Sequence, residues 1–195
     1  MENNLMKKKI CLLLFAAVLG LTACGKGKPE ENNQTGTEQV QEYRTDVPVE
    51  ELKNAVAKEL GEDYWPNMAL GEEEIEGLLG LKADAIEEAV AEMPMISTNV
   101  DTLIIVRADK GKLEEVEKAV ADYRERMVGD TMQYPMNVGK VQASKTAVYG
   151  DYVCFVQLGG DTMEASGQGD EAVIKQCEAA NERALSVIQK RLQTQ

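Results

Sequence analysis

The sequence contains no histidine. Histidine is the side chain whose ordinary pKa lies nearest neutral pH, and it is the usual base of serine–histidine–aspartate and cysteine–histidine sites. Its absence excludes those catalytic arrangements and every histidine-ligated metal centre. Any catalysis would depend on carboxylates, tyrosines or lysines. We predict no catalytic, cofactor-binding or metal-binding residue, and we expect a protein that is not an enzyme and needs no cofactor.

Aromatic and basic residues are also scarce. Aromatic residues make up 5% of the chain, with one tryptophan, and 21 lysines and arginines face 34 acidic residues, for a net charge of −13. Nucleic acids and anionic surfaces are bound by clusters of lysine and arginine, and no such patch is visible. The composition therefore argues against a nucleic-acid partner.

The N-terminal segment carries the clearest pattern that is present. Lys7, Lys8 and Lys9 precede an apolar run, 10–21, which is shorter than the ~20 residues of a membrane-spanning helix. A basic cluster, a short apolar run and small residues before a cleavage point are typical of a secretory signal peptide. The sequence predicts that residues 1–23 are such a peptide.

The end of this segment, Leu21-Thr22-Ala23-Cys24, resembles the lipobox of bacterial lipoproteins. The resemblance implies that Cys24 receives a diacylglyceryl group and becomes the new N-terminus after cleavage. Two fatty acyl chains, such as palmitate, hold a protein on a bilayer firmly, since each buried CH₂ contributes about 0.8 kcal/mol. We therefore expect a lipid-anchored protein on the outer face of the cell membrane, with the membrane as its partner through the anchor.

The remainder divides into a linker and one domain. Residues 24–46 are polar, with almost no large apolar side chains, so they cannot bury enough surface to offset the entropy of ordering. We interpret them as a flexible linker. Residues 47–195 have the length of one ordinary domain.

Hydrophobic periodicity predicts the elements of that domain. A first helix runs from Val49 and ends at Gly61, and a β-branched, apolar segment predicts a central strand. The other predicted elements are helices over 72–79, 82–93, 112–127 and 170–192, a loop through Tyr134-Pro135, and a hairpin of 143–148 and 152–158, with the central strand over 102–108. We expect an α+β fold in which a small three-stranded sheet has helices packed on one face and is preceded by an N-terminal helical segment. Whether the central strand pairs with the first or the second hairpin strand stays open.

Short motifs in this order resemble a known family. They are Asp101-Thr102-Leu103-Ile104-Ile105-Val106-Arg107-Ala108, the helix end at 123–126, Tyr134-Pro135, and the segment 150–156. Together they are similar to the domain of unknown function 4358, a family made up mainly of lipoproteins of low-GC Gram-positive bacteria, over about residues 50–160. The family has no assigned activity, so the resemblance implies no catalytic or ligand residue.

Two glycine- and acid-rich patterns are weak candidates for sites. Gly167-Gln168-Gly169-Asp170-Glu171-Ala172 fits a loose dinucleotide motif, but it does not follow a strand directly, and its acids suit a helix N-terminus with Asp170 as the cap. The acids of the same loop, Asp161, Glu164, Asp170 and Glu171, offer oxygen ligands for calcium without the EF-hand spacing. A solvated loop is the simpler reading. The acidic runs 72–74 and 87–88 are likewise read as solvated helix faces.

Three further features involve aromatic and sulfur side chains. Trp65 beside Tyr64 suits stacking on a sugar or aromatic ligand, although closing the end of the helical layer is the preferred interpretation. Tyr134-Pro135 is read as a turn. Cys154 and Cys177 both face the layer between sheet and helix, and we expect two buried free thiols rather than a disulfide.

From these observations we expect a membrane-anchored extracytoplasmic lipoprotein that acts as a non-catalytic binding or envelope-associated module. The alternative is a carboxylate-dependent hydrolase or a calcium-dependent module. Two close, buried carboxylates in one cleft would favour the hydrolase, and acids spread over a convex surface would favour the binding module.

Overall fold

The computed structural model describes residues 42–96 and 98–194. The predicted signal peptide, Cys24 and most of the predicted linker lie outside the described residues. Within them, no helix is both long and apolar enough to cross a bilayer. All that follows concerns the compact unit to which these residues belong.

The sheet is larger than the sequence predicts. It has five antiparallel strands among the described residues, in the order β1-β2-β3-β5-β4. Their bounds are β1 Met68–Ala69, β2 Ile86–Met93, β3 Thr102–Ala108, β4 Lys145–Tyr149 and β5 Tyr152–Gln157. The central strand β3 pairs with the second hairpin strand, β5, with Ile105 opposite Cys154. The expectation of a small three-stranded sheet is therefore wrong.

The two additional strands are β2, which lies in the segment predicted as a helix over 82–93, and the short β1, Met68–Ala69, which lies between the first two predicted helices, where no strand is predicted. After a short 3₁₀ turn at Ala83–Ala85, the chain forms β2, which pairs along β3 and carries the short β1 on its other edge. Glutamate, alanine and methionine favour helix in isolation, but such propensities are weak and tertiary contacts override them. Here Val90 lies opposite the buried Ile105, and the hydrogen bonds to β3 decide the conformation.

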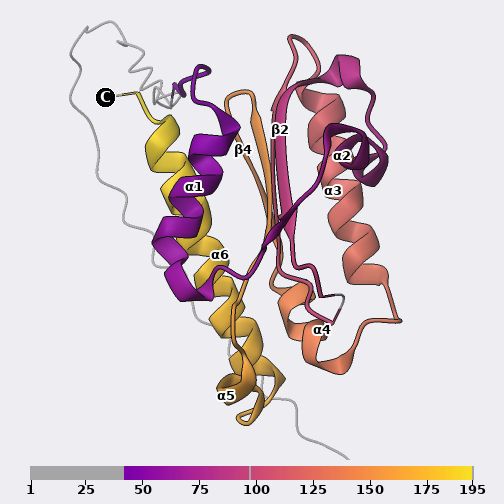
Figure 1. Ribbon diagram of the computed structural model, residues 1–195, viewed down its shortest axis with the longest axis vertical. Helices are drawn as coiled ribbons and strands as arrows, with labels where there is room; N and C mark the ends of the chain where they lie inside the picture. Colours follow the sequence, from indigo (N-terminus) through magenta and orange to yellow (C-terminus); the bar gives the residue numbers. More distant parts are fainter. Residues whose placement is uncertain (1–41, 97, 195) are drawn as a thin grey trace, which may run out of the picture. The chain divides into compact units, whose positions relative to one another are not determined.

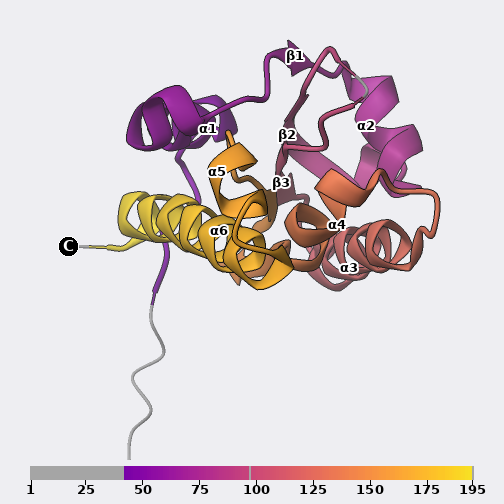
Figure 2. The same cartoon turned by 90° about the horizontal axis from the view of Figure 1, so that it is seen from below.

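Helices cover both faces of the sheet, which corrects the expectation of one covered face (Figures 1 and 2). On one face lie α1, Val49–Leu60, and α6, Asp170–Leu192; on the other lie α2, Glu72–Leu79, and α3, Leu113–Gly129. The reason lies in β3, where the consecutive residues Ile104 and Ile105 point to opposite faces and are both fully buried, one in each core. A strand that is apolar on both sides requires cover on both sides.

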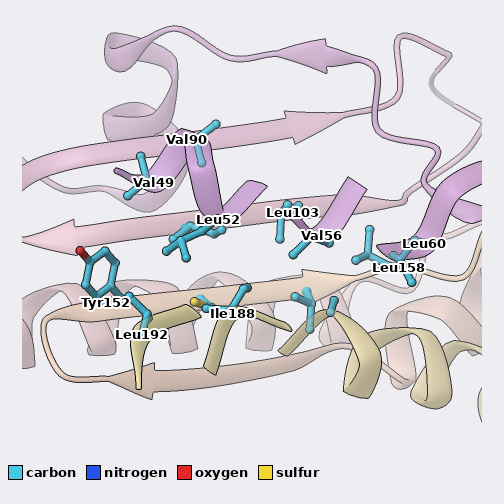
Figure 3. Packing of buried hydrophobic residues seen from close by; sticks show 14 of the residues in the cluster. Val49, Leu52, Val56, Leu60, Val90, Leu103, Tyr152, Leu158, Ile188 and Leu192 are labelled. Carbon is cyan, nitrogen blue, oxygen red and sulfur yellow. The ribbon is translucent and has the colours of Figure 1, made fainter. Parts of the chain in front are cut away.

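One core lies between the sheet and the helices α1 and α6 (Figure 3). Leu52 and Val56 of α1 and Ile188 of α6 meet Leu103 of β3, and Tyr152 of β5 closes one end. The Tyr152 hydroxyl donates to the Val47 carbonyl and accepts from the Val47 N–H, which holds the start of α1 on the sheet. Cys154 and Cys177 are both buried free thiols, as expected.

The two remaining helices, α4 Pro135–Gln142 and α5 Met163–Ser166, lie toward one end of the sheet (Figure 1). The segment around Tyr134-Pro135, expected to be a loop, is therefore the start of a helix, with Tyr134 as its N-cap and proline in its first turn. The loop from β2 to β3 reaches the same end, because the Asn137 side chain donates to the Thr98 carbonyl.

Residues 42–46, the last of the predicted linker, contact the domain. The Arg44 N–H donates to the Leu192 carbonyl at 2.7 Å, and Tyr43 forms a β-bridge with Gln193. Tyr43 also packs against Tyr149, with ring centroids 5.5 Å apart. This segment is thus fastened beside the end of α6.

Candidate functional site

A buried ion pair lies at the α4–α5 end of the sheet. Nζ of Lys140 is 2.5 Å from Oδ1 of Asp101, and the two residues are 3% and 0% exposed. The ammonium also donates to the Gly160 carbonyl at 2.6 Å. Charged groups are almost never fully buried unless they are paired, so each member of this pair makes the burial of the other possible.

Three segments far apart in sequence meet here because of the strand pairing. Asp101 immediately precedes β3, and Gly159 and Gly160 follow β5 shortly after its end. Since β3 and β5 are antiparallel, with Thr102 opposite Gln157, the start of one strand lies beside the end of the other. Helix α4 then brings Lys140 over this point.

The second oxygen of Asp101 is held by backbone. Oδ2 accepts hydrogen bonds from the N–H groups of Gly159, at 3.1 Å, and Gly160, at 2.9 Å. Burial raises the pKa of the Asp101 carboxyl, and the Lys140 ammonium and these N–H groups oppose that rise. Gly160 has φ +58°, and a Cβ there would lie 2.9 Å from Cα of Asp63. The carboxylate site therefore requires a glycine at position 160.

Trp65 lies beside the ammonium, in the segment that follows α1. Nζ of Lys140 is 5.0 Å from the centroid of the indole ring, within the range of a cation–π contact. The indole N–H donates to the Glu62 carbonyl, which fixes the ring. The ring remains 38% exposed, so the interpretation of Trp65 as a closure of the helical layer is only partly met: it also lines an open surface.

That open surface is a hollow of about 370 Å³, which we call the Trp65 hollow. Its accessible lining is mainly apolar, and Lys140 forms part of it. The lining residues come from the segment after α1, the β2–β3 loop, α4, and the turn and helix after β5: Trp65, Thr98, Asn99, Met136, Asn137, Lys140, Gly160, Asp161, Thr162, Met163 and Ser166. A lysine has three donors, and two of them are used by Asp101 and Gly160.

The glycine-rich motif before α6 is not brought to this hollow. Helix α5 stands between β5 and α6, so the glycines do not follow a strand. Gly169, not Asp170, is the N-cap of α6, and Asp170 and Glu171 lie in its first turn. The acids of the candidate calcium loop do not gather either: within residues 42–96 and 98–194 no three acidic, histidine or cysteine residues are grouped as a metal site would need.

Glu72 of the first acidic run lines the same groove as both residues of the second run. Glu72 and Glu76 of α2 face Glu87 and Glu88 of β2 across a groove of about 150 Å³. Arg107 of β3 pairs with both Glu87 and Glu88, at 3.3 and 3.1 Å. The run 87–88 is therefore on a strand and partly neutralised, whereas it was expected on a solvated helix face.

Sequence reasoning missed Asp101 and Lys140 as a site. They are 39 residues apart and belong to no spacing motif. The available indication was local: a carboxylate directly precedes a strand whose centre, 103–106, is entirely apolar, in the run that carries the family resemblance. Nothing in the sequence of α4 marks Lys140 as buried.

Comparison with known proteins identifies the family of this chain. Residues 60–158 match the family described as Domain of unknown function (DUF4358), which confirms the resemblance. No curated protein and no solved structure matches the chain. The matched region contains Trp65, Asp101 and Lys140 and ends just before Gly159. The chain belongs to the DUF4358 family.

Proposed function

We propose that this protein is a lipid-anchored, extracytoplasmic binding module whose ligand occupies the Trp65 hollow. The observation that carries the proposal is the hollow itself, in which exposed apolar side chains surround a buried, hydrogen-bonded ion pair. Binding sites are typically concave and mainly apolar, with a few polar groups that fix orientation. The anchor at Cys24 and the location outside the cytoplasm are proposed from the lipobox resemblance.

The contrast with the rest of the fold supports this choice of site. The leucines, isoleucines and valines of the two cores are almost completely buried, whereas Met136 and Met163 at the hollow are 62% and 80% exposed. Exposed apolar groups that gather around a concavity mark interaction sites more often than single exposed residues do. The hollow therefore gathers exposed apolar side chains that a ligand can cover.

Each group has a role that follows from its position. Trp65 offers a rigid aromatic face, and the methionines offer flexible apolar contact. Lys140 has a donor beyond those used by Asp101 and Gly160, and it lines the hollow. The two glycine N–H groups hold Asp101, and Asp101 holds that ammonium, so together they position a charged donor within a mainly apolar surface.

A binding role fits the buried charges better than hydrolysis does. Among the described residues Asp101 is the carboxylate that is fully buried, and a lysine rather than a second acid faces it. Carboxylate-dependent hydrolysis needs two acids in one cleft, one of them as an acid or nucleophile. We therefore propose a non-catalytic module.

The hollow is tested with a neutral apolar probe, dansylamide, added to the full chain in phosphatidylcholine vesicles. Trp65 is the only tryptophan of the chain, so its emission reports on probe that binds near this residue. We expect saturable quenching of Trp65 emission, weakened about tenfold by Met163→Gln, because one lost apolar contact of this size corresponds to about 1.4 kcal/mol. Val128→Gln, at an exposed apolar position on α3, is the matched control. Unchanged Trp65 emission throughout the titration would refute the site.

The anchor is tested separately through Cys24→Ser. Metabolic labelling with a radioactive fatty acid should mark the natural chain and disappear in this variant. Labelling that persisted in the variant would contradict the proposed lipidation.

A further inference from the structure

The exposed apolar residues of the described chain concentrate around the Trp65 hollow. Met95 and Ile96 of the β2–β3 loop are 73% and 67% exposed. The loop is tied to both sides of the hollow: the Met95 N–H donates to the Asn67 side chain, close to Trp65, and the Asn137 side chain of α4 donates to the Thr98 carbonyl. The hollow is therefore the centre of a wider apolar surface rather than an isolated pit.

Methionine dominates this surface. Met95, Met136 and Met163 belong to it, and Met132 just before α4 is also highly exposed. Methionine is unbranched and polarisable, so a methionine-rich surface can repack around an irregular apolar partner. Trp65 and Tyr134 add aromatic side chains of the kind that contribute most of the binding free energy at protein interfaces.

The charged side chains near the hollow are mainly acidic. Segments 61–69, 94–101, 130–142 and 159–169 lie toward this end, and Lys140 is their one basic residue. It is neutralised by Asp101. Lys175 of α6 lies beside Glu164, just beyond these segments. The other charged side chains of these segments are all acidic: Glu62, Asp63, Asp130, Asp161 and Glu164. Asp161 lines the hollow itself, and the other acids belong to the segments around it. Such an acidic, apolar surface is complementary to an apolar surface that carries positive charge.

We infer that the Trp65 hollow binds a positively charged, apolar segment of another protein. The inference rests on the proposed binding function and assigns its partner class. A second copy of this chain is disfavoured because its net charge of −13 opposes the same acidic rim. An anionic membrane surface is disfavoured for the same reason, since such surfaces attract basic residues.

The test uses the full chain in neutral phosphatidylcholine vesicles, with protein-free vesicles as the blank and Trp65 emission as the signal. The probes are two amphipathic peptides without tryptophan, one of leucine and lysine and one of leucine and glutamate. We expect the leucine–lysine peptide to shift Trp65 emission saturably, and the leucine–glutamate peptide to leave it unchanged. Added salt should weaken the binding, because the acidic rim is exposed to solvent.

Variants separate the apolar part from the charged part. Met136→Gln and Met163→Gln should each weaken peptide binding about tenfold, because each removes one apolar contact. Asp161→Asn and Glu164→Gln should each weaken it about threefold and flatten its salt dependence, since exposed charges contribute little individually. Val128→Gln on α3 should leave the affinity as it is.

The other outcomes overturn the inference in distinguishable ways. Equal binding of both peptides, or binding of dansylamide with neither peptide, would refute the charged partner and leave the binding function standing. Failure of both peptides and of dansylamide would refute the two together. A shift of Trp65 emission on adding phosphatidylglycerol vesicles alone, or self-association abolished by Met163→Gln, would show a membrane or a second copy as the occupant instead.

Discussion

Removing the carboxylate of the buried pair should destabilise the fold strongly. In Asp101→Ala the Lys140 ammonium keeps only the Gly160 carbonyl and the Trp65 ring as neighbours, and the N–H groups of Gly159 and Gly160 lose their acceptor. Taking one partner from a buried ion pair typically costs about 3–5 kcal/mol. We expect a loss of about 4 kcal/mol in the free energy of unfolding.

The two halves of the pair should not be equivalent. Lys140→Met leaves Asp101 with both glycine N–H donors, so its cost should be smaller, about 2–3 kcal/mol. The double variant Asp101→Ala/Lys140→Met carries no buried charge at this site. It should be more stable than the sum of the single effects predicts, by about 1–3 kcal/mol.

Urea unfolding followed by circular dichroism measures these differences without depending on Trp65, which lies beside the pair. With a slope of about 2 kcal/mol per molar urea for a domain of this size, Asp101→Ala should lower the midpoint by about 2 M. The control is the exposed pair Lys118–Asp122 on α3, whose removal should cost no more than about 0.5 kcal/mol. A cost below about 1 kcal/mol for Asp101→Ala, or strict additivity in the double variant, would refute the reasoning.

Three further predictions test the structure elsewhere. Burial raises the pKa of the Cys154 thiol to about 12, so above the ordinary value of 9.0 the unfolded chain releases a proton that the folded chain keeps. The free energy of unfolding should therefore fall as the pH rises from 9. In urea melts at stepped pH, Cys154→Ala should remove up to about 1.4 kcal/mol per pH unit of that slope. A slope equal to that of the natural chain would contradict the burial of the thiol. A fragment that starts at residue 42 should have a free energy of unfolding about 1–3 kcal/mol higher than one that starts at residue 47, because the shorter fragment lacks the backbone bonds to the end of α6. Equal urea midpoints would show that residues 42–46 contribute nothing to stability. Gly160→Ala should cost about 2 kcal/mol or more through its positive φ and its contact with Asp63, whereas Gly129→Ala on α3, where a Cβ meets nothing, should be neutral or slightly stabilising in the same assay.

Elements with strong local patterns were predictable from the sequence. The stripes of α1, α3 and α6 repeat at helical spacing, and β3 and the hairpin are rich in β-branched and aromatic residues bounded by turn residues. The segment 86–93 was not predictable, because its residues favour a helix and its strand conformation depends on pairing with β3. Helix α4 was missed because its Pro-Met-Asn-Val-Gly-Lys sequence has a weak apolar stripe and contains glycine.

The candidate site also has a part that was predictable from the sequence and a part that was not. Trp65 stood out in the sequence as the single tryptophan beside a tyrosine, and it does line the hollow. The pairing of Asp101 with Lys140, and the acceptance of two glycine N–H bonds by that carboxylate, require the antiparallel register of β3 and β5. No local pattern specifies contacts between residues that are tens of positions apart.

Properties that depend on composition and on neighbouring residues could be obtained from the sequence. They are the helical and strand periodicities, the acidic balance, the absence of histidine, and the expectation of a cleaved leader followed by lipidation of Cys24. The tertiary structure alone decided what depends on distant partners. It made a strand of residues with helical propensity, placed helices on both faces of a five-stranded sheet, and buried Lys140 against Asp101 beneath an exposed tryptophan. The physical reason is that burial and hydrogen-bond pairing outweigh local propensities of a few tenths of a kcal/mol per residue, and they act only once the chain is folded.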